Sequence, residues 1–237
     1  MQKRKLIIII ISIILAITIA SGSIYVFGFY LPNKKKQEEA KNFFKVYYES
    51  KVASYQEENE KFDDYEVDTA FIGDSLTDGY DLTKYYPDLV TANRGIGGDT
   101  TFGLEARLKV SVYDLKPKVV AMLIGANNLD TMFQNYENIL TGLKDNLPET
   151  KVVLLSLTAM GGSWGHNNQL ATYNNVKIKK LAEKYGFSFV DLYTPLFNEN
   201  LGEIYPEYTT DGGHLTPLGY EVFTSALYPT LKILLNK

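Results

Sequence analysis

The residues Asp68-Thr69-Ala70-Phe71-Ile72-Gly73-Asp74-Ser75-Leu76-Thr77-Asp78-Gly79 join a short apolar run to a polar turn. The run over residues 68–72 has the length and composition of a buried strand. Gly73 permits a sharp turn after it, and Ser75 just beyond would be presented at the sheet edge. On these residues alone, a polar surface turn is a better interpretation than a catalytic one.

Downstream of this stretch, short apolar runs alternate with longer segments of helical periodicity in the 237-residue chain. The expected strands are residues 68–72, 89–93, 119–124, 152–157 and 187–192, and the expected helices lie near residues 100–115, 134–146, 168–185 and 217–235. This alternation predicts an α/β fold with a five-stranded parallel sheet and helices on both faces. Catalytic groups in such folds gather at the carboxyl ends of the strands.

The N-terminal segment, residues 6–31, contains no charged side chain over 26 positions. A helix of about 20 apolar residues spans a hydrocarbon core, so we expect a transmembrane anchor. A cleaved signal peptide is the alternative, with residues 6–20 as its apolar part and small residues at 20–23 near the cleavage point. Basic residues at 3–5 and 34–36 flank both ends, so charge does not decide the orientation. We expect the N-terminus inside and the following domain outside.

Residues 37–66 are charged and free of glycine and proline, with aromatic residues at helical spacing. This pattern predicts an amphipathic helix. The helix could be the first packed helix of the domain, which we favour, or a stalk above the membrane. The expected organisation is an anchor with basic flanks over residues 1–36, a juxtamembrane helix over 37–66 and a globular domain over 67–237.

The charge and composition of the chain limit the classes of partner and ligand that we expect it to bind. Apart from the six basic residues that flank the anchor, 18 basic residues stand against 28 acidic ones, so residues 37–237 carry a net charge of −10. A nucleic-acid-binding protein needs the opposite sign, and we expect no such partner. The chain has no cysteine and two histidines, which are too few of the usual ligands for a zinc site. We therefore predict no metal and no cofactor.

Three further motifs follow the predicted pattern of strands. Residues 93–100 (NRGIGGDT) hold three glycines in four positions, which suits a backbone that approaches a bound group, although a flexible loop with a helix cap is the alternative. Residues 125–128 (GANN) end the third strand with asparagines that either shape a turn or donate to an oxyanion. Residues 211–214 (DGGH) precede the last helix. There the Asp211 carboxylate can bind Nδ1 of His214 and leave Nε2 facing a nucleophile, although a capping Asp beside an exposed His is the alternative.

In this order, and over about residues 68–235, the four motifs resemble those of the SGNH, or GDSL, hydrolase family. The resemblance implies a three-layer, flavodoxin-like sandwich and a serine esterase domain. It also implies roles for the matching residues: Ser75 as nucleophile, His214 as general base and Asp211 as the group that orients the imidazole. The implied oxyanion hole consists of the backbone N–H groups of Ser75 and Gly98 and the side-chain amide of Asn127.

Within this family, the motifs look closest to the branch of the acetylhydrolase subunits that act on platelet-activating factor, together with related bacterial esterases. Asn128 stands where many members have Asp. Because the preceding Asn127 is the implied donor, this departure leaves the expectation of activity unchanged.

The loops between the motifs are short and include no long apolar lid, which favours an open site and small acyl groups such as acetyl. Trp164 and His166 follow the fourth strand and are candidates for a substrate lip, with a plain surface loop as the alternative. The substrate is an acyl ester of carbohydrate or lipid, and the acidic domain favours carbohydrate. Alternatives are a lysophospholipase-type esterase and a non-catalytic binding protein. The expected location is the outer face of a cell membrane, or the exterior after signal cleavage.

Overall fold

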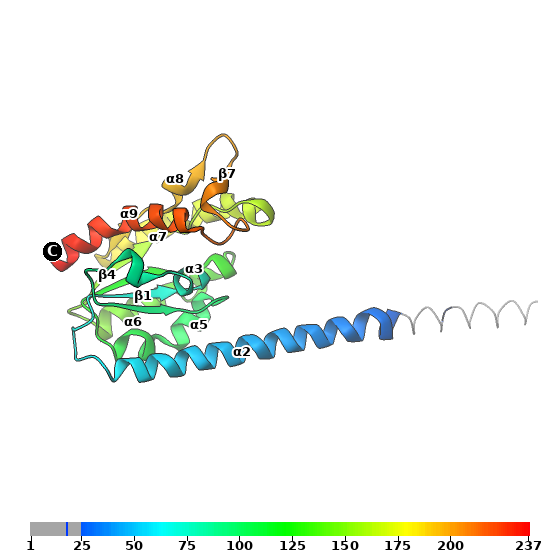
Figure 1. Ribbon diagram of the computed structural model, residues 1–237, viewed down its shortest axis with the longest axis horizontal. Coiled ribbons are helices and arrows are strands. Elements are labelled where there is room, and N and C mark those ends of the chain that lie inside the picture. The colour runs from blue at the N-terminus through cyan, green and yellow to red at the C-terminus, as the bar shows by residue number, and fades with distance from the viewer. Residues whose placement is uncertain (1–17, 19–24) are drawn as a thin grey trace, which may run out of the picture. The chain divides into compact units, whose positions relative to one another are not determined.

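The computed structural model of the chain describes residue 18 and residues 25–237 (Figure 1). It divides into two compact units, Met1–Ser50 and Lys51–Lys237. The sheet and all the motifs discussed above belong to the second unit.

A five-stranded parallel sheet forms the centre of this unit. Its strands are β1 (Thr69–Gly73), β2 (Thr91–Gly95), β3 (Val119–Leu123), β4 (Lys151–Leu155) and β5 (Ser188–Val190). Their order is β2-β1-β3-β4-β5, and every pair is parallel. All residues of β1 and β3 are buried, as expected for strands covered on both faces. The carboxyl ends of β1, β2 and β3 are in register, with Gly73 opposite both Gly95 and Leu123.

Helices cover both faces of the sheet. They are α3 (Ser75–Asp78), α4 (Leu82–Tyr85), α5 (Thr101–Ala106), α6 (Tyr136–Asn146), α7 (Asn168–Tyr185), α8 (Tyr193–Leu196) and α9 (Pro217–Leu235). In Figure 1, α9 lies above the sheet and α5 and α6 lie below it. The ion pair of Lys184 with Glu137 joins α7 to α6.

Aromatic side chains fill the space between β1 and α9. Phe71 of β1 lies 5.1 Å, centroid to centroid, from Tyr86, which contacts Tyr228 of α9 edge-on at 5.2 Å. Tyr80 meets Phe223 of α9 edge-on at 4.8 Å. Edge-to-face pairs at such spacings stabilise a core beyond simple area burial.

The predicted fold class is confirmed, and each predicted strand overlaps an observed one. The helices expected at 168–185 and 217–235 have the observed bounds of α7 and α9. The segment expected as one helix over 100–115 instead consists of α5 and a π-helical turn, Lys109–Tyr113. Arg107 separates the two pieces and turns its guanidinium into the protein interior.

Several short elements were not predicted. They are the antiparallel pair β6 (Phe197–Asn198) and β7 (Glu203–Ile204), the 3₁₀ turns Ala126–Asn128, Met132–Gln134, Gly162–Asn167 and Pro206–Tyr208, and a π-helical turn at Val26–Tyr30.

The long helix α2 runs over Leu31–Asn59 and ends before residue 66. Phe43 and Val46 are exposed, whereas Tyr55 is 1% exposed, so burial is confined to the last turns of the helix. Within the described residues, no helix is both long and apolar enough to cross a membrane. The anchor expected over residues 6–31 lies largely outside the described residues and stays a prediction.

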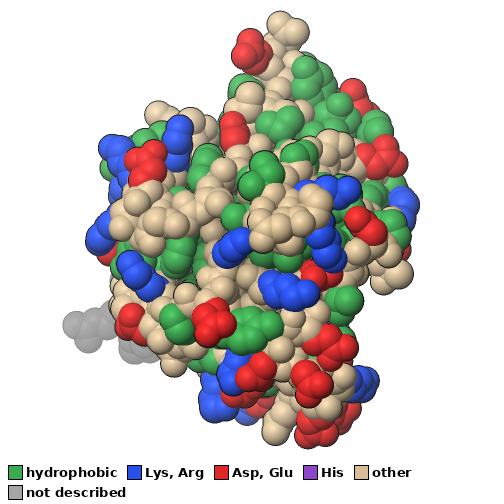
Figure 2. All heavy atoms as spheres, turned by 90° about the vertical axis from the view of Figure 1, so that its left-hand side faces the viewer, with side chains coloured by type: hydrophobic (Ala, Val, Ile, Leu, Met, Phe, Trp, Pro, Cys, Tyr) green, Lys and Arg blue, Asp and Glu red, His purple; other side chains and the backbone are tan. Residues whose placement is uncertain are grey.

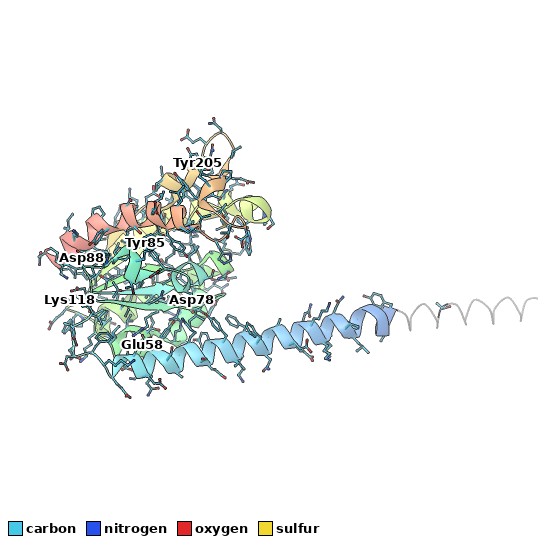
Figure 3. The ribbon with its side chains drawn as sticks, in the orientation of Figure 1. Glu58, Asp78, Tyr85, Asp88, Lys118 and Tyr205 are labelled. Carbon is cyan, nitrogen blue, oxygen red and sulfur yellow. The ribbon has the colours of Figure 1, made fainter. Side chains whose placement is uncertain are left out.

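Charged side chains of both signs are mixed over the face of the molecule seen in Figure 2. Most are exposed, but Asp68, just before β1, is buried. Its carboxylate accepts hydrogen bonds from Nζ of Lys118, which is labelled in Figure 3, at 2.8 Å, from Nζ of Lys237 at 2.6 Å and from the N–H of Val90 at 3.0 Å. This carboxylate therefore ties the last residue of the chain to the start of the sheet.

Candidate active site

Ser75 lies directly after the carboxyl end of β1, as the first residue of α3. Asp74 caps this helix by accepting the N–H of Leu76 at 3.1 Å. A Cβ at position 73 would lie 2.2 Å from the Leu123 carbonyl oxygen and 2.3 Å from Oγ1 of Thr77. Only glycine fits between these atoms, so Gly73 is what allows β1 to pack against β3 and turn at once into the helix that carries Ser75.

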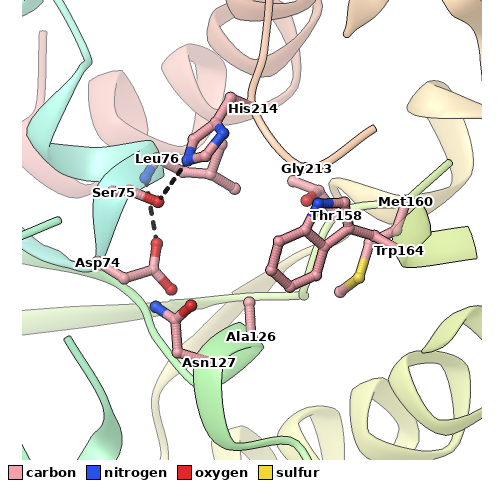
Figure 4. Close-up of a pocket in the computed structure, with 10 residues that line it drawn as sticks. All are labelled: Asp74, Ser75, Leu76, Ala126, Asn127, Thr158, Met160, Trp164, Gly213 and His214. Atoms are coloured by element: carbon pink, nitrogen blue, oxygen red, sulfur yellow. Dashed lines mark hydrogen bonds between the residues drawn. The ribbon is translucent and has the colours of Figure 1, made fainter. Parts of the chain in front are cut away.

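Ser75, His214 and Asp211 are in hydrogen-bond contact. The Ser75 Oγ lies 3.0 Å from Nε2 of His214 (Figure 4), and Nδ1 of His214 lies 2.7 Å from Oδ2 of Asp211. With its proton on Nδ1, the imidazole donates to Asp211 and its Nε2 can accept the Ser75 hydroxyl proton.

The loop that carries Asp211 and His214 is fixed by its own backbone. Oδ1 of Asp211 accepts the N–H groups of Gly213 at 2.9 Å and His214 at 2.8 Å. The hydrogen bond from His214 and these two N–H groups lower the pKa of the Asp211 carboxyl to about 2. Asp211 is therefore ionised at any physiological pH.

The loop also packs on the segment that follows β4. The Gly161 N–H donates to the Gly212 carbonyl at 2.8 Å. Gly212 has φ +91°, and a Cβ there would lie 2.0 Å from the Gly161 carbonyl oxygen. Any larger residue at position 212 would push the histidine loop away from its support.

Asn127 follows β3 and faces the same site. Its Nδ2 donates to the Asp99 carbonyl at 2.8 Å, which fixes the amide and leaves its second N–H to point elsewhere. Asn128 turns away: its amide donates to Oγ1 of Thr101 at 2.9 Å. The neighbouring Gly98 is exposed and has φ +77°, a conformation that glycine adopts without strain.

A buried ion pair supports the glycine loop from below. Arg107 Nε donates to Oδ2 of Asp99 at 2.8 Å, and both side chains are at most 2% exposed. The same guanidinium donates to the carbonyl of Arg94 at 2.8 Å, Oγ of Ser111 at 2.9 Å and the carbonyl of Gly73 at 2.9 Å. Arg107 thus joins the ends of β1 and β2 to the loop. Burial raises the pKa of the Asp99 carboxyl, and Arg107 opposes that effect.

Asp74, beside the serine, is 2% exposed. In the part of the chain that the structure describes, its Oδ2 has no hydrogen-bond partner. Burial raises the pKa of this carboxyl to about 7. Asp74 is therefore a helix cap whose second oxygen is left unsatisfied.

A cavity of about 40 Å³ opens beside Ser75 and His214. Its other lining residues are Asp74, Leu76, Ala126, Asn127, Thr158, Met160, Trp164 and Gly213 (Figure 4). The wall away from the catalytic pair is largely apolar. The cavity is small and partly open to solvent, so its closed side offers room for a short group.

Comparison with known proteins assigns the chain to a family. Residues 71–222, more than half of the chain, match the model of the GDSL-like Lipase/Acylhydrolase family. The chain belongs to this family. It is accordingly an ester hydrolase, and the sheet described above is the fold of GDSL hydrolases.

Individual relatives of this GDSL-like acylhydrolase are distant. An acetylxylan esterase of Geobacillus stearothermophilus is 28% identical over 177 residues, which cover 57% of this chain and 80% of that protein. A GDSL-like lipase from Bacteroides thetaiotaomicron superposes with a TM-score of 0.66 at 25% identity, covering 76% of this chain and 97% of that one. A chain from Streptococcus pneumonia named for platelet activating factor superposes with a TM-score of 0.72 at 23% identity, covering 84% and 99% of the two chains. At 23% identity, the similarity to the Streptococcus pneumonia chain concerns the fold alone.

Within the GDSL-like acylhydrolase, Ser75, Asn127, His214 and Trp164 line one cavity, and Asp211 lies behind His214. Gly98 belongs to the adjoining loop and is not among the residues that line the cavity. His166 is exposed in the same 3₁₀ turn as Trp164 and also lies outside the lining. The lip proposed for Trp164 and His166 stays a prediction.

Six residues of the cavity wall received no site role from the sequence, namely Asp74, Leu76, Ala126, Thr158, Met160 and Gly213. Four of them adjoin residues that were identified, and Thr158 and Met160 follow β4. The rule that places functional groups at strand carboxyl ends could have identified Thr158 and Met160.

Proposed function

We propose that the chain is a membrane-anchored, extracytoplasmic serine esterase that removes acetyl-like groups from carbohydrate. The observation that carries this proposal is the hydrogen-bonded series from Ser75 Oγ through both ring nitrogens of His214 to Asp211, with distances of 3.0 and 2.7 Å. The series lies at the mouth of a cavity that fits only a small group.

In the acylation step, Ser75 Oγ attacks the carbonyl carbon of the ester while His214 Nε2 takes the hydroxyl proton. The carbonyl oxygen becomes an oxyanion in a tetrahedral intermediate. His214 then gives its proton to the alkoxide oxygen of the leaving group. The bond between that oxygen and the carbonyl carbon breaks, an alcohol departs and the acyl group stays on Ser75.

The oxyanion needs donors that are already in position. The backbone N–H groups of Ser75 and Gly98 and the free N–H of Asn127 fill this role. The contact of Asn127 with the Asp99 carbonyl fixes the amide before substrate binds. Donors that are already held in place stabilise the transition state most strongly.

In the second half of the reaction, water replaces the alcohol. His214 accepts a proton from the water as it attacks the acyl carbon, and returns a proton to Ser75 Oγ as the acid leaves. Asp211 keeps its charge throughout, since its carboxyl has a pKa of about 2. It stabilises the imidazolium that forms in each half.

The cavity supports the small acyl group. Trp164 and Met160 close the side opposite His214 (Figure 4), and the enclosed volume is about 40 Å³. A methyl group fits such a space. Each further methylene would have to displace the indole or remain in solvent, and a hydrophobic pocket discriminates by about 1–3 kcal/mol for each methylene.

Carbohydrate is the better of the two substrate classes for two reasons. The relative with 28% identity is an acetylxylan esterase. Residues 37–237 also carry a net charge of −10, which does not favour approach to an anionic lipid surface. The apolar segment at residues 6–31 would hold the enzyme at the outer face of a membrane, within reach of surface carbohydrate.

Labelling and turnover of the full chain in mild detergent test this proposal. A fluorophosphonate should label the wild-type chain and the exposed-serine control Ser225→Ala, but not Ser75→Ala. Acetylated polysaccharide and p-nitrophenyl acetate should be hydrolysed at least about tenfold more efficiently, in kcat/KM, than butyryl and longer esters.

Two results would overturn the proposal. Label retained in Ser75→Ala would reject the nucleophile. A lysophospholipid or long-chain ester preferred over every acetylated carbohydrate would reject the substrate class. Protease accessibility on intact cells tests the location, and protection of the domain would reject an extracytoplasmic site.

A further inference from the structure

The last turns of α2 lie against the glycine loop of the candidate active site. The hydroxyl of Tyr55 donates to the Gly95 carbonyl at 2.5 Å, and Tyr55 is 1% exposed. Lys51, one turn earlier, forms an ion pair at 2.8 Å with Asp78, the last residue of α3. This part of α2 therefore contacts both segments that carry the backbone oxyanion donors, Ser75 and Gly98.

Asp78 connects three elements through one carboxylate. Its Oδ1 accepts Nζ of Lys51 at 2.8 Å, and its Oδ2 accepts the N–H of Gly97 at 2.8 Å (Figure 3). The bonded N–H belongs to the Ile96–Gly97 peptide, one peptide before the N–H of Gly98, and α3 begins with Ser75. The carboxylate thus fixes the distance between the helix of the nucleophile and the loop that carries Gly98.

Asp78 needs the lysine for electrostatic reasons. Its side chain is 16% exposed and that of Lys51 is 26% exposed, so water screens the carboxylate only in part. An unpaired negative charge at this place would repel the oxyanion that forms nearby. Lys51 neutralises it and leaves a carboxylate that still accepts a strong, charge-assisted hydrogen bond from the loop.

A second set of contacts holds the same turns of α2 in place. Arg94 of β2 is fully buried and donates to Oε2 of Glu58 at 2.5 Å and Oδ1 of Asn59 at 3.0 Å. Its guanidinium also lies over the Tyr55 ring, 4.8 Å from the centroid. Because Arg94 anchors this end of the helix, loss of the Lys51 contact should leave the helix packed.

We propose that Lys51 is a positioning residue: through Asp78 it holds the N–H of Gly97, and thereby keeps the N–H of Gly98, one peptide further on, where it meets the oxyanion. The last turns of α2, which lie within the juxtamembrane helix expected over residues 37–66, then belong to the catalytic unit. This inference rests on the proposed function, since it presumes that Ser75 and Gly98 act together.

The test compares variants of the full chain in mild detergent, with p-nitrophenyl acetate as substrate. Lys51→Met should lower kcat at least about tenfold while KM changes less than about twofold, because a misplaced oxyanion donor weakens the transition state more than the ground state. The rate of fluorophosphonate labelling should fall in parallel. Lys51→Arg, which keeps the charge, should recover most of the lost turnover.

Lys184→Met serves as the matched control, because it breaks an ion pair with Glu137 on α6 and α7, away from the glycine loop. It should leave kcat within about twofold of the wild type. The double variant Lys51→Met/Asp78→Asn should lose no more turnover than the worse single variant, because both changes act through one contact.

Three outcomes would overturn the inference: wild-type kcat in Lys51→Met, a loss confined to KM, or a loss that Lys51→Arg does not restore. Thermal melts measure how much of each variant is folded. A fall in kcat that matches the fraction of unfolded protein would also count against a positioning role for Lys51. The variant Ser75→Ala distinguishes a failure of the proposed function from a failure of the role of Lys51. If that variant stays active the proposed function fails, whereas an inactive Ser75→Ala beside a fully active Lys51→Met rejects only the role of Lys51.

Discussion

Replacing Asp74 by asparagine should change how the stability of the protein depends on pH. Asp74 is 2% exposed, and burial raises the pKa of its carboxyl from 3.8 to about 7. The N–H of Leu76 and the nearby His214 oppose this rise, and the charge of Asp99 adds to it. Burial dominates because a carboxylate loses its hydration there and one of its oxygens gains no partner.

The sign and size of this pH dependence follow from the linkage between proton binding and folding. The unfolded chain ionises Asp74 near pH 3.8, whereas the folded chain keeps the proton until about pH 7. The stability contributed by the protonated carboxyl is therefore complete below pH 3.8 and is lost as the pH rises through about 7. At about 1.36 kcal/mol for each pKa unit, the full loss is about 4 kcal/mol.

Asparagine keeps an oxygen that can accept the Leu76 N–H but has no proton to lose. The free energy of unfolding of the wild type, relative to that of Asp74→Asn, should therefore fall by about 4 kcal/mol between about pH 4 and about pH 8. Urea unfolding of the full chain in mild detergent, followed by circular dichroism, measures this difference directly. Groups that titrate in the same way in the wild type and in Asp74→Asn cancel in the difference between the two free energies of unfolding.

Asp81→Asn is the matched control, because Asp81 caps the four-residue helix α4 from an exposed position. Its replacement shows what the loss of a capping carboxylate does by itself when that carboxylate is not buried. A difference between wild type and Asp74→Asn that stays constant from pH 4 to pH 8, or that grows in favour of the wild type, would refute the reasoning. Asp74 would then be ionised in the folded protein throughout.

Three other substitutions test separate parts of the molecule. Asn127→Ala should lower kcat for p-nitrophenyl acetate by about 10²–10³ through loss of an oxyanion donor, and a loss below threefold would contradict that role. Trp164→Ala should raise the ratio of butyryl to acetyl kcat/KM at least about tenfold by enlarging the cavity, whereas an unchanged ratio would remove the indole from the acyl site. Asp68→Asn concerns stability: burial of the carboxylate is outweighed by its hydrogen bonds to Lys118 and Lys237, and the pKa is lowered to about 2. The substitution should therefore cost about 2 kcal/mol near pH 7, and the cost should vanish as the pH falls from about 4 to about 2; an equal cost at both ends would refute it.

The sequence predicted the sheet well because buried parallel strands leave an unambiguous pattern. The run over residues 119–124 is continuously apolar and that over residues 152–157 is interrupted only by Ser156, and the two runs form the strands β3 and β4. The break at Arg107 was not predictable from periodicity. It depends on carbonyl groups of Gly73 and Arg94, which are brought to Arg107 only by the fold.

The contacts of the candidate site also differ in how far the sequence could predict them. Asp211 and His214 are three positions apart, so their contact could be inferred from local geometry. The contact of Ser75 with His214 spans 139 positions and could be expected only from the shared order of motifs. Lys51 and Asp78 carry no motif at all: a lysine on a charged helix and an aspartate in a turn look like ordinary surface residues until the fold places them 2.8 Å apart.

The separation of Ser75 from His214 also bears on the synthesis of the protein. A ribosome adds Ser75 long before His214, and the loop at 209–214 holds its shape through Thr209 and Thr210, which both contact the His214 carbonyl. A nascent chain consequently carries a serine without a base until His214 has been added. If the chain leaves the cell unfolded, the base would first reach the serine on the far side of the membrane, and esters in the compartment of synthesis would never meet the assembled pair.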